Sequence, residues 1–93
     1  MEQYVVTSTW INKTENTLST TTRIYQNKEE ALVDYNEDIH YTLMAYAGDI
    51  LLNIENDDEK IVKLYLYDGR RGDDDTITCH EIEVINSFSK VSE

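Results

Sequence analysis

The chain has 93 residues, of which 19 are acidic and 8 basic, so its formal net charge is −11. That length fits one domain with a single core, and the lone cysteine, Cys79, excludes an internal disulfide and fits a reducing cytoplasm. No apolar run is long enough to cross a bilayer, and the acidity favours positively charged partners over membranes or direct nucleic-acid binding.

Two strands are predicted at the start of the chain. The segment Tyr4–Asn12 alternates and is rich in Val, Thr, Trp and Ile, and Thr17–Gln26 is a second β-branched run. The polar residues Lys13–Asn16 between them suit a hairpin turn. Because Leu18 and Ile24 share one face of the second strand and polar residues the other, we expect one side of this hairpin to face water.

A helix follows, because the apolar period changes from two to about 3.6. We place it at Lys28–Ala47, with Asn27 as its N-cap, Glu30 completing a capping-box pair and Gly48 at a left-handed C-terminal position. Its apolar stripe recurs at spacings of three or four residues and consists of Leu32, Tyr35, Ile39, Leu43 and Tyr46.

Three more strands are predicted after the helix. Ile50–Asn56 and Ile61–Tyr67 are joined by the charged turn Asp57–Lys60, and a glycine-containing loop, Asp68–Asp75, leads to a last strand at Thr76–Asn86. In the second of these strands the alternation predicts an inward-facing set close to Trp10. That set comprises Val62, Leu64 and Leu66.

The last strand changes phase, since Ile77 and Cys79 share one parity whereas Ile82 and Val84 share the other. A β-bulge near His80–Glu81 would reconcile them. The remaining residues, 87–93, are predicted to form a loose tail of a single domain spanning 1–93.

The predicted fold class is α+β, an antiparallel β-sheet of element order β-β-α-β-β-β with one helix packed on one face. The first hairpin and the last three strands could instead form two bent sheets, and the sequence leaves both arrangements open.

Catalytic and metal-binding chemistry finds little support. Neighbouring strand residues point to opposite faces, so Cys79 and His80 are interpreted as a buried thiol and an edge histidine rather than one site. The run Asp73–Asp75 lacks the layout of a calcium loop, and the basic island Gly69–Gly72 is flanked by carboxylates that neutralise it. We predict no catalytic residue, no metal site and no cofactor.

The most informative segment is Glu29–Glu59, which carries ten carboxylates and no lysine or arginine. We expect one helix face, opposite the apolar stripe, to be acidic. Carboxylates four residues apart are about 6 Å apart along a helix, near the spacing of successive nucleic-acid phosphates, and like charges at that spacing mildly destabilise a helix. The predicted partner-binding residues are Glu30, Asp34, Glu37, Asp38, Tyr41, Asp57, Asp58 and Glu59.

In length, charge and this acidic stretch, the chain resembles small phage-encoded inhibitors of bacterial defence systems, anti-CRISPR proteins especially. The resemblance is at the level of a class and transfers no site residues. It implies a non-enzymatic inhibitor, monomeric or homodimeric, that acts in the bacterial host cytoplasm. Its acidic, phosphate-mimicking face would bind a basic, nucleic-acid-binding surface of a host defence nuclease, with a CRISPR effector favoured.

Two alternatives stay open from the same residues. One is a cytosolic immunity or antitoxin-type protein that neutralises a basic toxin, because the same charges would serve it. The other is a self-assembling structural module joined through a strand edge.

Overall fold

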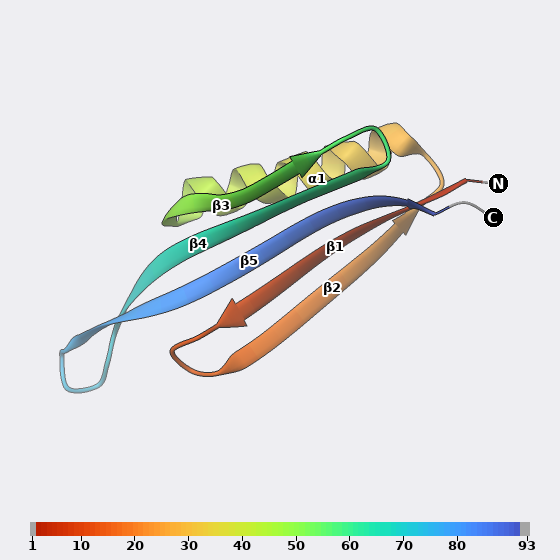
Figure 1. Cartoon of the computed structure of the whole chain (residues 1–93). Coiled ribbons are helices and arrows are strands. Elements are labelled where there is room, and N and C mark those ends of the chain that lie inside the picture. The colour runs from red at the N-terminus through yellow and green to blue at the C-terminus, as the bar shows by residue number, and fades with distance from the viewer. Residues whose placement is uncertain (1, 92–93) are drawn as a thin grey trace.

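The computed structural model describes residues 2–91, which form one five-stranded antiparallel sheet and one helix (Figure 1). In chain order the elements are β1 (Gln3–Asn12), β2 (Thr17–Tyr25), α1 (Lys28–Ala45), β3 (Ala47–Glu55), β4 (Glu59–Arg71) and β5 (Ile77–Val91). The strands lie in the order β2-β1-β5-β4-β3. The predicted α+β class and element order are confirmed, and the strands form one sheet rather than two.

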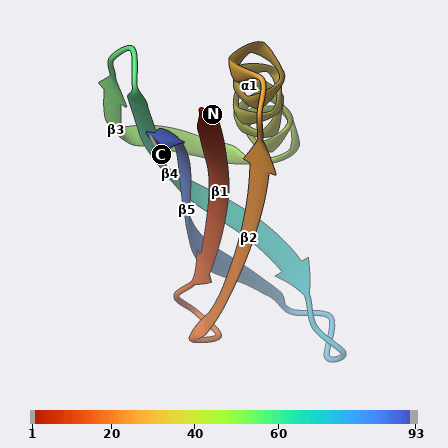
Figure 2. The same cartoon turned by 90° about the vertical axis from the view of Figure 1, so that its right-hand side faces the viewer.

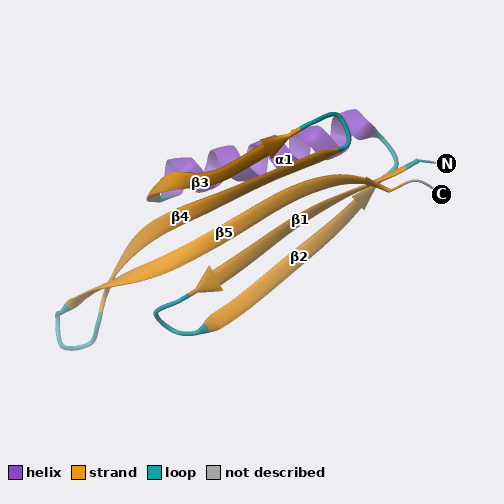
Figure 3. Ribbon diagram, viewed as in Figure 1, coloured by secondary structure: helices purple, strands orange, loops and turns teal. Residues whose placement is uncertain are grey.

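The helix α1 connects the two edges of this sheet, because β2 precedes it and β3 follows it. It therefore lies across one face of the sheet (Figures 2 and 3). Its contacts are mainly with β1 and β5. The molecule is elongated, 55 Å along its longest axis, and the β4–β5 hairpin extends well beyond the helix (Figure 1).

The core lies between α1 and the sheet face beneath it, and it consists of two clusters. The first joins β1, β5 and α1, with the buried residues Tyr4, Val6, Ala31, Tyr35 and Phe88. The second joins β4 and β5, with the buried residues Val62, Leu64, Leu66, Ile82 and Val84. Trp10 packs against the second cluster, so the inward face predicted for β4 is confirmed.

The predicted loose tail is wrong for residues 87–91. These residues belong to β5, the central strand, which pairs with β1 on one side and β4 on the other. Phe88 is fully buried. The polar residues around it are compatible with a central strand because Ser87 and Ser89 point to the face that the helix does not cover. Residues 92–93, the rest of the predicted tail, lie outside the described residues.

The predicted bulge at His80–Glu81 is also wrong. Pairing between β4 and β5 keeps one register from Glu59 opposite Ser89 to Arg71 opposite Ile77. The end of this hairpin extends beyond the helix, where no helix covers the sheet (Figure 1). Apolar residues such as Ile77 are exposed there, so they need not share a face with the buried residues Ile82 and Val84. The register shift of the sheet lies instead in β3, between Ile50 and Leu52.

Other element ends also differ from the prediction, and β3 begins at Ala47 rather than Ile50. The strand β4 continues to Arg71, so the predicted loop Asp68–Asp75 begins later than expected. The N-cap Asn27 is confirmed, since its side chain accepts hydrogen bonds from the amides of Glu29 and Glu30. The helix ends at Ala45, before the predicted Ala47, and Tyr46 is an extended C-cap.

Gly48 has a different role from the predicted one. It lies in β3 and no described glycine has a positive φ. A Cβ atom at this position would lie 2.3 Å from the carbonyl oxygen of Tyr65 and 2.7 Å from Cδ2 of Leu66. Glycine is required here because β3 approaches β4 closely, and a left-handed turn plays no part.

Candidate functional site

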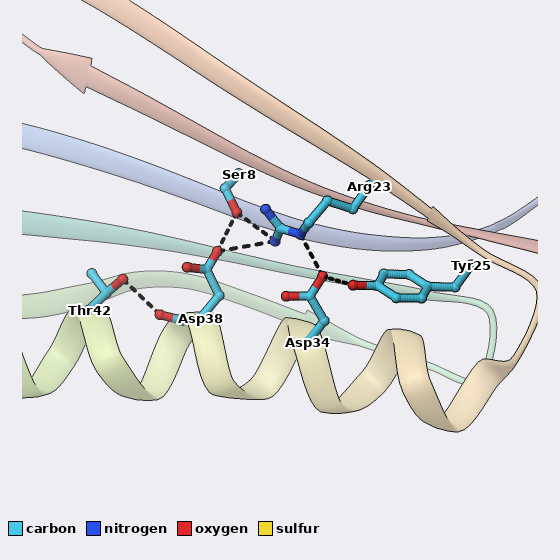
Figure 4. A network of polar contacts seen from close by, with 6 residues as sticks. All are labelled: Ser8, Arg23, Tyr25, Asp34, Asp38 and Thr42. Carbon is cyan, nitrogen blue, oxygen red and sulfur yellow. Dashed lines mark hydrogen bonds and ion pairs between the residues drawn. The ribbon is translucent and has the colours of Figure 1, made fainter.

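A polar network joins the side of α1 that faces β2 to the sheet (Figure 4). The guanidinium of Arg23 on β2 donates through Nε to Oδ2 of Asp34 at 2.5 Å, and its Nη2 lies 3.6 Å from Oδ2 of Asp38. The hydroxyl of Tyr25 donates to the same Asp34 oxygen at 2.6 Å. The hydroxyl of Ser8 donates to Asp38. Three side chains from two strands therefore contact the carboxylates of Asp34 and Asp38.

The charges in this network shift the ionisation of its members. Burial acts to lower the pKa of Arg23, but the hydrogen bond and charge of Asp34 outweigh it, so the pKa of the guanidinium is raised. The hydrogen bond to Asp34 also raises the pKa of the Tyr25 hydroxyl above its usual range. Both groups therefore keep their protons throughout the neutral range.

A groove opens directly beside this network, between α1 and β2. Its volume is ≈ 550 Å³, and its lining residues are Tyr25, Glu29, Glu30, Val33, Asp34 and Glu37. Four of the six carry carboxylates and none is a lysine or arginine. Glu29 and Glu30 also lie in the first turn of the helix, where the backbone dipole stabilises negative charge.

The predicted acidic helix face is divided by this arrangement. Glu30 and Glu37 are exposed in the groove, and within residues 2–91 neither takes part in an ion pair. The side chains of Asp34 and Asp38 turn toward the sheet and share Arg23, so they do not lie opposite the apolar stripe. The stripe shifts accordingly. Ala31, Tyr35 and Thr42 are buried, whereas Leu43 is exposed.

Tyr41 is exposed on α1 and packs its ring against His40. It does not line the groove.

The remaining predicted site residues lie in the turn between β3 and β4. The side chain of Asn56 accepts hydrogen bonds from the amides of Asp58 and Glu59, and the carbonyl of Asp58 accepts from the amide of Lys90. Asp57, Asp58 and Glu59 are exposed. This turn lies at the same end of the molecule as the start of α1, but apart from it (Figures 1 and 2). The two acidic groups therefore form separate surfaces.

Tyr25, Glu29 and Val33 line the groove but were not among the predicted site residues. A signal for Tyr25 was present in the alternation of β2, which places it on the same face as Arg23. That face packs toward α1, while Leu18 and Ile24 on the other face are exposed. The water-facing side of this hairpin thus carries its apolar residues.

The other groups considered for chemistry show no reactive arrangement. Cys79 is exposed and His80 is buried, the reverse of the predicted burial. Nδ1 of His80 lies 3.2 Å from Nδ2 of Asn12. Arg70 pairs with Asp68 at 3.0 Å and Arg71 lies 3.4 Å from Asp75, in line with the expected neutralisation of the basic island.

Two absences hold for the described part of the chain. Residues 2–91 contain no group of three or more His, Cys, Asp or Glu side chains placed to hold a metal ion. No helix in this range combines the length and the apolar character needed to cross a membrane.

Comparison with known proteins finds no matching family model, no similar curated protein and no similar solved structure.

Proposed function

We propose that this protein is a non-enzymatic inhibitor that binds the basic, nucleic-acid-binding surface of a host defence nuclease. The observation that carries the proposal is the groove between α1 and β2, where four carboxylates converge without a cation among the lining residues. A lysine or arginine side chain entering this groove would meet the free carboxylates of Glu30 and Glu37. It would also meet the ring of Tyr25, a surface that favours cations.

The groove changes how phosphate mimicry would work. Asp34 and Asp38 are neutralised in part by Arg23, so they do not extend a row of free charges along the helix. The free carboxylates of Glu30 and Glu37 are seven residues apart, about 10 Å along the axis. This surface fits two separate basic side chains of a partner better than it imitates a continuous backbone.

The target class rests on the resemblance to anti-CRISPR proteins in size and charge. A CRISPR effector is the favoured target, and occupation of its nucleic-acid channel in the host cytoplasm is the proposed mode of inhibition. Electrostatic attraction from a chain of net charge −11 would accelerate association with such a channel.

A direct test titrates the protein into purified CRISPR effector nucleases and measures DNA binding and DNA cleavage. The informative variant is Glu30→Gln/Glu37→Gln, which removes two charges from the groove without touching Arg23. Its matched control is Asp73→Asn/Asp75→Asn, which removes two charges from the exposed β4–β5 turn. Asparagine suits residue 75 because Asp75 has φ 64°.

We expect the groove variant to associate roughly tenfold more slowly and the control to change by less than about twofold. Capture of partners from a bacterial lysate at roughly 50 mM and roughly 300 mM salt checks the electrostatic origin, since salt screens exposed charges. Equal inhibition by both variants would refute the groove as the site that binds the nuclease. A purified basic toxin as the captured partner would instead favour the immunity-protein alternative.

A further inference from the structure

The strand β2 forms an edge of the sheet with few of the features that normally prevent edge pairing. It spans nine residues, Thr17–Tyr25, and pairs only with β1 among the described strands. It contains no proline, no carboxylate and no bulge. Its one charge, Arg23, is turned toward α1 and held by Asp34. A long neutral edge of this kind is a template for another strand.

The opposite edge, β3, is protected. It carries Asp49 and Glu55, and its register shifts between Ile50 and Leu52. Charges and bulges are the features by which natural sheets avoid edge-to-edge contact. The contrast between the two edges points to β2 as the edge that takes a partner strand.

Charge is distributed unevenly, and this favours a second copy of the same chain at β2. Residues 3–28 contain three cations and one carboxylate, whereas residues 29–59 contain ten carboxylates and no cation. Two molecules of net charge −11 repel one another least where their carboxylates are fewest. The β1–β2 hairpin is that part of the molecule.

We propose that β2 pairs antiparallel with β2 of a second copy, about a two-fold axis at Thr21. The sequence of the strand is self-complementary in this register. Leu18 lies opposite Ile24 of the second copy, and Thr20 lies opposite Thr22. Leu18 and Ile24 are 68% and 64% exposed in one copy, and both lie on the face away from α1. Pairing would cover them with each other.

The neighbouring strand extends this contact. Within one copy, Ile11 lies beside Leu18 and Val5 beside Ile24. The dimer would therefore contain two rows of four apolar side chains that cross the interface on the uncovered face. Cross-strand pairs of β-branched and aliphatic residues stabilise sheets in this way.

The pairing would create one ten-stranded sheet with both copies of α1 on the same face. Each helix lies mainly over β1 and β5, so the two axes would be roughly 20 Å apart at the usual strand spacing. Tyr25 lies opposite Thr17 of the second copy in this register, so the two grooves would lie on the same face but at opposite ends of the paired strands. The pairing itself does not depend on the proposed function, but it would make the acidic surface bivalent.

Salt should affect the dimer and the inhibitor complex in opposite directions. The edge contact is small compared with a standard interface, so we expect weak, concentration-dependent association. Because like-charged copies repel, raising the salt should strengthen the dimer. The same change should weaken binding to a basic partner, so failure of either proposal can be recognised separately.

Sedimentation velocity of the full chain tests the proposal across roughly 10 μM to 1 mM protein, a range suited to weak association, at low and high salt. We expect the dimer fraction to rise with concentration and with salt. Leu18→Lys/Ile24→Lys should abolish it, because both side chains are exposed in the monomer. The control Ile77→Lys, at a residue 70% exposed on the β4–β5 hairpin, should dimerise like the wild type.

Cross-linking tests the register in a way that does not depend on those lysines. In a Cys79→Ser background, Thr21→Cys places two thiols opposite each other, with Cβ atoms about 5 Å apart, close enough for a disulfide. Ser19→Cys places its thiol opposite Arg23 and should cross-link at least about tenfold less. Wild-type protein that stays monomeric at every protein and salt concentration would overturn the proposal, and β2 would then be available only to a strand of another protein. Association that survives the double lysine variant, or equal cross-linking of the two cysteines, would also overturn it.

Discussion

Arg23 on β2 and Asp34 on α1 form the contact that fixes the helix to the first hairpin, with Nε of the arginine 2.5 Å from Oδ2 of the aspartate. The same guanidinium lies 3.6 Å from Asp38, one helical turn further along. Two carboxylates four residues apart would repel each other on an isolated helix. The shared arginine converts that repulsion into an attachment between helix and sheet.

Removing this arginine should therefore destabilise the fold. Arg23→Leu leaves two half-buried carboxylates without their cation, and we expect a loss of about 1–3 kcal/mol in the free energy of unfolding, less than for a fully buried pair because the partners keep contact with water. Urea unfolding measures it. The control Arg70→Leu removes an exposed ion pair with Asp68 and should cost less than about 1 kcal/mol. Equal midpoints for the two variants would contradict a structural role for Arg23.

Asn86 is a buried polar residue of the central strand β5. It is 1% exposed, and within the described residues neither its Oδ1 nor its Nδ2 has a hydrogen-bond partner. An unsatisfied buried amide costs roughly 1–3 kcal/mol, so Asn86→Leu, which is similar in size, should raise the free energy of unfolding by about that amount. Asn53→Leu, at an exposed position of β3, is the control and should change it by less than about 0.5 kcal/mol. A less stable Asn86→Leu protein would show that the amide has a partner in solution.

The stability of the protein should fall in alkali because of Tyr35. Burial, with a smaller contribution from Glu55, raises the pKa of Tyr35 from 10.0 to about 12. Between these values the unfolded chain releases the proton and the folded chain keeps it, so stability is fully present below pH 10 and declines as the pH rises toward 12. The slope from one such group is at most about 1.4 kcal/mol per pH unit.

Other tyrosines contribute to this decline, because the pKa values of Tyr4, Tyr25 and Tyr65 are also raised. Comparison of the wild type with Tyr35→Phe isolates the effect. Urea midpoints at roughly pH 9 and pH 11, on either side of the usual tyrosine pKa, should converge in the variant more than in the wild type. The control Tyr41→Phe, at an exposed position, should keep the wild-type slope.

The sequence predicted the fold where a single pattern decides the outcome. The change of period at Asn27, with its cap, located the start of the helix, and alternation located the inward face of β4. The end of β5, which contains Phe88, was missed because the neighbours of Phe88 are serines. A central strand covered by only one helix can place serines on its open face. These residues gain their role from pairing with strands distant in the chain, since Phe88 lies opposite Val6 of β1 and Lys60 of β4.

The candidate site was predicted in part for a similar reason. Composition identified Glu30, Asp34 and Glu37, and all three line the groove. Composition alone did not reveal that Arg23 would meet Asp34, because that contact depends on which side of α1 turns toward β2. The helix rotates to neutralise its two aspartates, and this rotation exposes Leu43 and buries Thr42.

At Gly48, β3 approaches β4 so closely that a larger residue should destabilise the fold. Gly48→Ala would place a methyl group within 2.3 Å of the Tyr65 carbonyl oxygen, so β3 must shift, and we expect a loss above about 2 kcal/mol. Gly69→Ala is a matched control in β4, because its nearest neighbour, Cγ2 of Ile77, is 3.8 Å away. That change should be neutral or slightly stabilising, since glycine is unfavourable inside a strand. Thermal unfolding of the two variants would decide the point, and similar melting temperatures would contradict the close approach.

The carboxylates of α1 should separate into two classes when they are neutralised. Asp34→Asn/Asp38→Asn leaves Arg23 half-buried without a counter-charge, so the free energy of unfolding should fall by about 1–3 kcal/mol. Glu30→Gln/Glu37→Gln removes the same formal charge from exposed positions, so stability should stay within about 0.5 kcal/mol or rise slightly as repulsion decreases.

The two double variants have equal net charge, so a difference between them cannot come from overall repulsion. Urea unfolding at roughly 50 mM and roughly 500 mM salt tests this further, because screening acts mainly on exposed charges. The aspartate variant should remain the less stable one at both salt concentrations. If the glutamate variant were instead the less stable, Glu30 and Glu37 would be structural residues, and the groove would lose the free carboxylates on which the inhibitor proposal depends.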